Sequence, residues 1–229
     1  MKDIVALFTT ALRHLIASPL AFFLVSLPTA LCEIIFEYQT PADNTQPNYA
    51  ALIFAFLGIW VLNNVICSAS FTLVQGSAQS SARRAFRQAF HVFPTLAPLA
   101  LITGVAVILG CLLVLPGLYF LTIFAFVPCV VADLPPQRSI FDYLALSQGW
   151  ANRVFVRLFV LTTLFFLLNI LVSVSNGPVE HLLVPLISSP WQEGVIFLSK
   201  LLPYTFLTAL TNAVTATYYL RLRGEHPAH

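Results

Sequence analysis

Six long apolar runs divide the chain, and their length decides which folds are open to it. They cover about residues 19–36, 50–74, 95–114, 118–133, 155–175 and 195–219. A helix needs about 20 apolar residues to cross a bilayer core about 30 Å thick, and these runs reach or approach that length. Only 9% of the 229 residues are charged, whereas soluble domains carry about 25%. Such sparse charge cannot cover a water-facing surface. The chain is therefore predicted to be an all-helical bundle of six transmembrane helices forming a single membrane domain over residues 1–229.

The clearest pair of predicted spans lies at residues 95–133. The first apolar run ends at Val114, the second begins at Leu118, and Leu115, Pro116 and Gly117 stand between them. Proline suits the start of a helix, and glycine suits a sharp turn. The segment is therefore predicted to be a helical hairpin whose tip is formed by residues 115–117.

Amphipathic segments precede the first, third and fifth runs, at about residues 4–16, 82–93 and 139–150. In the second of them, alanine and phenylalanine share one helical face and arginine the other, at the i, i+3, i+4, i+7 spacing of a helix. The third opens with Ser139 and Asp142, which fit a capping box. Helices of this kind lie in the membrane interface. The pattern predicts a pseudo-threefold repeat, in which each unit is an interfacial helix followed by a helical hairpin.

Charge is distributed asymmetrically about the six predicted spans. Ten of the eleven basic residues fall on one side, and the exception is Lys200. The other side holds the carboxylates Glu33, Glu37, Asp43, Glu180 and Glu193. Because lysine and arginine favour the cytoplasmic side, both termini are predicted to be cytoplasmic.

Several polar residues fall inside the predicted spans. Glu33 and Lys200 lie at similar depths in the first and sixth spans and are interpreted as an ion pair. The alternatives are that each extends to the outer interface, or that they take part in substrate or proton movement. The intramembrane asparagines are Asn63, Asn64, Asn169 and Asn212. They are expected to form hydrogen bonds between helices, and a polar ligand cavity is the alternative.

The arginines of the second amphipathic segment, Arg83, Arg84 and Arg87, form a small basic face. The topology alone accounts for their position, and a site for lipid headgroups or for a partner protein is the functional alternative. The basic set is too small to indicate nucleic-acid binding. The chain has no catalytic motif such as Gly-x-Ser-x-Gly, His-Glu-x-x-His or a phosphate-binding glycine loop. No enzymatic activity, cofactor or metal site is predicted.

Three short segments carry a resemblance to a known family. They are Val114-Leu115-Pro116-Gly117-Leu118, Trp150-Ala151-Asn152-Arg153 and Tyr218-Tyr219-Leu220-Arg221-Leu222-Arg223. In order and spacing they resemble the YciC-like family of bacterial inner-membrane proteins, best over about residues 95–223. The likeness to the membrane domain of some glycerophosphodiester phosphodiesterases is more distant. The resemblance implies six helices in a bacterial inner membrane, a family without an assigned biochemical role, and no catalytic residues.

The expected function is that of a non-enzymatic multi-pass protein of the bacterial inner membrane. It would organise or sense membrane lipids or partner membrane proteins. The alternative is a small transporter or channel whose polar path runs near Asn64, Asn169 and Asn212. An intramembrane lipid enzyme ranks third, and the sequence leaves the oligomeric state open.

Overall fold

The fold is known from a computed structural model that describes residues 2–39, 49–76, 81–111, 115–134, 138–183 and 189–225. Every regular element in these ranges is an α-helix. The helices are α1 (Lys2–Ala17), α2 (Pro19–Gln39), α3 (Tyr49–Gln75), α4 (Ala82–Cys111), α5 (Leu115–Ile123), α6 (Val127–Asp133), α7 (Ile140–Arg153), α8 (Phe155–Leu183) and α9 (Ser189–Glu225). Five helical segments, with α5 and α6 counted as one, are long and apolar enough to cross a membrane, and the bent pair α1–α2 would make a sixth. The prediction of an all-helical fold is thus confirmed. The predicted number of six spans is matched only if the bent pair α1–α2 counts as one span, and the threefold repeat stays a prediction.

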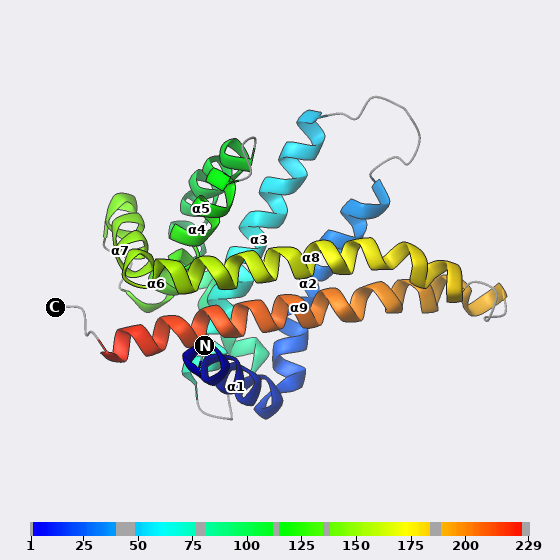
Figure 1. Cartoon of the computed structure of the whole chain (residues 1–229), viewed down its shortest axis with the longest axis horizontal. Coiled ribbons are helices and arrows are strands. Elements are labelled where there is room, and N and C mark those ends of the chain that lie inside the picture. The colour runs from blue at the N-terminus through cyan, green and yellow to red at the C-terminus, as the bar shows by residue number, and fades with distance from the viewer. Residues whose placement is uncertain are drawn as a thin grey trace.

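Helix α3 runs through the centre of the molecule, and α8 and α9 lie side by side along its longest dimension (Figure 1). The second half of α3 packs against α2, α4, α6 and α9, and residues 64–74 are buried on almost every side. Its first half is more exposed, and Phe54 is 75% exposed. Exposed leucines and valines also line α8, for example Leu167, Leu171 and Val174. An apolar outer surface over a packed centre is the arrangement expected of helices surrounded by lipid.

The segments before the first and third spans differ in how they join those spans. Helix α1 is separated from α2 at Ser18 by a bend of 99°. Helix α4, by contrast, is continuous over 30 residues and passes through Pro94 and Pro98. The expectation of a separate interfacial helix at residues 82–93 is therefore wrong. Proline removes one backbone donor, and a helix continues past it where neighbouring helices and local adjustments satisfy the freed carbonyl.

The predicted tip of the central hairpin is also corrected. Leu115, Pro116 and Gly117 form the first turn of α5, so they are not the turn between the two helices. Residues 112–114, which join α4 to α5, lie outside the described residues. Proline is tolerated in the first turn because its missing N–H would have no partner there in any case. Gly110 and Gly117 allow the two helices to approach, since a Cβ atom on Gly117 would lie 2.7 Å from Sγ of Cys111.

The fourth predicted span is interrupted. Helix α5 ends at Ile123, and α6 begins at Val127 with Pro128 in its first turn. Two hydrogen bonds between residues three apart cross the gap. Ala125 N donates to Thr122 O at 3.3 Å, and Val127 N donates to Phe124 O at 3.1 Å. The break brings main-chain turns into the interior of the bundle, where irregular backbone in membrane proteins is found only beside protein or a cavity.

Two features of the last third of the chain bear on the site. The capping box of α7 is confirmed, because Asp142 N donates to Ser139 Oγ at 3.2 Å and Ser139 N donates to Asp142 Oδ2 at 3.0 Å. Helix α9 is 37 residues long, or about 55 Å at about 1.5 Å per residue. Because this exceeds a bilayer core of about 30 Å, only part of α9 could lie within such a core. The predicted sixth span, residues 195–219, is only its middle part.

Candidate functional site

A cavity of about 150 Å³ lies between α3, the α5–α6 segment, α8 and α9. Three of the four intramembrane asparagines line it. Asn63 and Asn64 come to it from α3, and Asn212 comes from α9. Asn169 lies outside it on α8, where its Nδ2 donates to the carbonyl of Phe165 at 3.0 Å. The structure therefore joins three of the four predicted polar residues in one cavity, and the fourth bonds within its own helix.

The polar groups of the cavity differ in how far their hydrogen-bonding capacity is used. Asn64 Nδ2 donates to the carbonyl of Trp60 at 2.9 Å. The hydroxyls of Thr211 and Thr215 donate to the carbonyls one turn earlier, at 2.8 and 2.9 Å. Asn212 is only 3% exposed, and its Nδ2 has no hydrogen-bond partner in the described part of the chain. The buried hydroxyl of Tyr218, which also lines the cavity, likewise has no partner there. Burying an unpaired donor costs about 1–3 kcal/mol, so Asn212 and Tyr218 are the groups here that would gain from an acceptor.

Trp60 forms an aromatic wall of the cavity, and α4 fixes its position. Its Nε1 donates to Thr103 Oγ1 at 3.2 Å, and its ring stacks on Phe56 with centroids 6.2 Å apart. Gly104 leaves room for the indole, because a Cβ atom there would lie 2.7 Å from Trp60 Cδ1. A glycine on α4 thus allows a large side chain of α3 to lie flat between the two helices.

The basic face at the start of α4 is present as predicted on sequence grounds. Arg83, Arg84 and Arg87 are exposed, whereas Ala85 and Ala89 on the other face are completely buried. The helix begins after Ser81, whose Oγ accepts from Arg84 N at 3.3 Å. Among the described residues, no ion pair includes any of these three arginines. Their charge is therefore not neutralised within that part of the chain.

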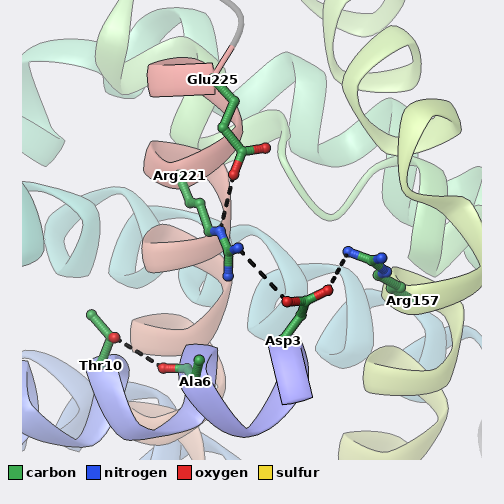
Figure 2. A network of polar contacts seen from close by, with 6 residues as sticks. All are labelled: Asp3, Ala6, Thr10, Arg157, Arg221 and Glu225. Carbon is green, nitrogen blue, oxygen red and sulfur yellow. Dashed lines mark hydrogen bonds and ion pairs between the residues drawn. The ribbon is translucent and has the colours of Figure 1, made fainter. Parts of the chain in front are cut away.

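Other charged residues meet where α1, α8 and α9 come together (Figure 2). Asp3 lies between two arginines, with Oδ2 3.2 Å from Arg157 Nη1 and Oδ1 4.0 Å from Arg221 Nη2. Arg221 also pairs with Glu225 at 3.1 Å. A second cavity of about 70 Å³ lies beside this cluster and shares Leu161 and Tyr218 with the asparagine-lined one. The ion pairs thus lie just outside the polar cavity.

Asp133, at the end of α6, is a residue that sequence reasoning missed. Its side chain is only 4% exposed and pairs with Arg223 of α9, and Tyr219 donates its hydroxyl to Asp133 Oδ2 at 3.1 Å. The Tyr219 ring also packs edge-on against Trp150, with centroids 6.4 Å apart. The sequence did contain a signal for this contact. Asp133 ends the fourth apolar run on the side where the arginines gather, and a carboxylate in that position is expected to pair with one of them.

Glu33 and Lys200 belong to helices that touch, as their predicted pairing requires. Helices α2 and α9 meet through a small apolar cluster that includes Ile34 and Leu201, the neighbours of the two charged residues in sequence. Within the described residues, however, no ion pair joins Glu33 to Lys200. Glu33 Oε2 is buried and has no hydrogen-bond partner there. The packing of the two spans is observed, and the ion pair itself stays a prediction.

Comparisons were made with protein family models, with curated proteins and with solved structures. None of the three finds a match to this chain. The resemblance to the YciC-like family therefore stays a prediction, and function has to be argued from the geometry above.

Proposed function

We propose that this chain is a non-enzymatic multi-pass protein of the bacterial inner membrane that holds anionic lipid headgroups at the basic face of α4, with both termini on the cytoplasmic side. One contrast carries the proposal. Arg157, Arg221 and Arg223 are each engaged by a carboxylate of the same chain. Arg83, Arg84 and Arg87 are exposed and have no such carboxylate in the described part of the chain.

The continuity of α4 supports this function. The basic face and the apolar part of the helix belong to one continuous helix from Ala82 to Cys111. A headgroup held at the basic end would therefore fix the depth and tilt of the hairpin formed by α4 and α5. Attraction of basic residues to anionic lipid is worth about 1 kcal/mol each near the surface, so three arginines supply about 3 kcal/mol.

The experiment measures which phospholipids remain bound to gently extracted protein, by native mass spectrometry. The variant Arg83→Gln/Arg84→Gln/Arg87→Gln is expected to lose anionic lipid and keep zwitterionic lipid. The matched control is Arg13→Gln/Arg138→Gln/Arg153→Gln, which removes the same charge from three other exposed arginines and should retain the anionic lipid. Equal lipid loss in both variants, or no loss in the first, would show that the face of α4 has no special role.

A small transporter or channel is the second candidate function. The observation in its favour is the cavity that Asn63, Asn64 and Asn212 line inside the bundle. Its test is the swelling rate of proteoliposomes in glycerol, followed by light scattering. Transport through this route predicts faster swelling than in protein-free vesicles and a slower rate after Asn212→Leu. Equal rates in all three preparations would exclude glycerol-sized solutes.

A further inference from the structure

We propose that the asparagine-lined cavity binds a neutral organic molecule. The molecule would be about the size of a six-membered ring and would carry a hydrogen-bond acceptor. The first support is size. The cavity measures about 150 Å³, and an interior cavity of about that volume is large enough to admit benzene. A ring-sized molecule therefore fits.

The hydrogen-bonding groups of the cavity define the polar part of the ligand. Asn212 presents an amide donor that lacks a partner in the described part of the chain. Asn64 uses its Nδ2 on Trp60, which leaves its Oδ1 as an acceptor. Thr211 and Thr215 donate to carbonyls, so their oxygens also remain acceptors. A molecule with one acceptor and one donor, such as a primary amide, would satisfy Asn212 and Asn64 together.

The absence of charge around the cavity makes the ligand neutral. None of its described lining residues is acidic, basic or histidine. An ion placed there would lose its hydration without gaining a counter-charge, which is costly in a low-dielectric interior. Arg157 and Arg221 lie beside the second cavity and act electrostatically on Tyr218, which lines both cavities. Each is already paired with a carboxylate (Figure 2), so neither offers a free counter-charge to an anion.

Aromatic rings supply the flat walls that a planar ligand needs. Trp60, Phe124 and Phe165 line the cavity from α3, the α5–α6 break and α8. Trp60 is held in place by its hydrogen bond to Thr103, so little side-chain freedom is lost when a ring stacks on it. The inference is independent of the lipid-headgroup function.

Fluorine NMR of the full-length protein in detergent tests the proposal, with para-fluorobenzamide as the probe and protein-free micelles as the blank. We expect saturable binding of this neutral amide and none of para-fluorobenzoate, which has the same ring but is charged. Asn212→Leu keeps the number and branching of the side-chain heavy atoms and removes the unpaired donor, and it should weaken binding about tenfold. Asn169→Leu is the matched control, because Asn169 lies outside the cavity, and it should leave the affinity unchanged.

A second variant covers the case in which Asn212→Leu does not fold. Ala125 lines the cavity at the α5–α6 break, and Ala125→Leu should exclude the probe by filling space without touching a polar group. The proposal is overturned if the probe shows no saturable binding above the blank, which would mean that the cavity holds water only. It is also overturned if the benzoate binds as tightly as the amide. Wild-type affinity in both Asn212→Leu and Ala125→Leu would place the probe elsewhere and reject the site.

Discussion

Gly110 of α4 and Gly117 of α5 touch across the central hairpin, because a Cβ atom on Gly110 would lie 2.8 Å from the backbone nitrogen of Gly117. The close contact is with backbone, which cannot move aside as a flexible side chain can. Gly110→Ala should therefore separate the two helices and destabilise the protein by about 1–3 kcal/mol, the usual cost of overpacking. The measurement is the midpoint of thermal unfolding in detergent.

The control for this prediction is Gly58→Ala on α3, where a Cβ atom meets nothing within 4 Å. Alanine is a better helix former than glycine by about 1 kcal/mol, so this variant should be neutral or slightly more stable. If Gly110→Ala unfolds at the same temperature as Gly58→Ala, the two helices are less tightly packed than their glycine contact indicates.

The buried carboxylate of Asp133 should contribute strongly to protein stability, because it joins the end of α6 to the end of α9. Asp133→Asn removes the ion pair with Arg223 and turns the bond from Tyr219 into a neutral one. The expected loss is about 2 kcal/mol, because hydrogen bonds to charged groups are worth about 1.5–3 kcal/mol. Tyr219→Phe should cost less in the Asp133→Asn background than in the wild type, since the two residues share one interaction.

Asp3→Asn is the matched control for Asp133, because it removes a carboxylate that also contacts arginine but whose side chain is 52% exposed. Exposed ion pairs are worth about 0–1 kcal/mol, and salt screens them. Its effect should be small at low salt and disappear at high salt. Equal losses for Asp3→Asn and Asp133→Asn would mean that burial does not distinguish the two carboxylates.

The lengths of the apolar runs were enough to predict the helices. The positions of the prolines were not enough to predict where those helices begin, continue or break. In the sequence, Pro19 and Pro94 each stand where an amphipathic segment meets an apolar run, and Pro128 lies inside the fourth run. The structure begins a helix at Pro19, continues one through Pro94 and restarts one at Pro128. The outcome depends on whether tertiary neighbours compensate for the missing N–H, and the local sequence does not contain that information.

The candidate site was predictable in its residue types and unpredictable in its geometry. Asparagines inside apolar runs indicated polar contacts within the bundle. Which of the asparagines share a cavity depends on how each helix is rotated about its own axis. Contacts between helices decide this rotation, and the close packing of Trp60 against Gly104 is one example. Asn212 and Asn64 therefore line the same cavity, whereas Asn169 lies outside it.

The last prediction concerns Glu33, whose Oε2 is buried without a hydrogen-bond partner in the described part of the chain. A neutral amide costs less to bury than a carboxylate, so Glu33→Gln should leave the unfolding midpoint in detergent unchanged or raise it. In the double variant Glu33→Gln/Lys200→Gln, the changes in unfolding free energy of the two single variants should add within about 0.5 kcal/mol, as expected for two residues that do not interact with each other. An ion pair between the two residues, the interpretation favoured by the sequence, requires the opposite result. In that case Glu33→Gln would lower the midpoint, and Lys200→Gln in the same background would lower it little further, because its partner would already be gone.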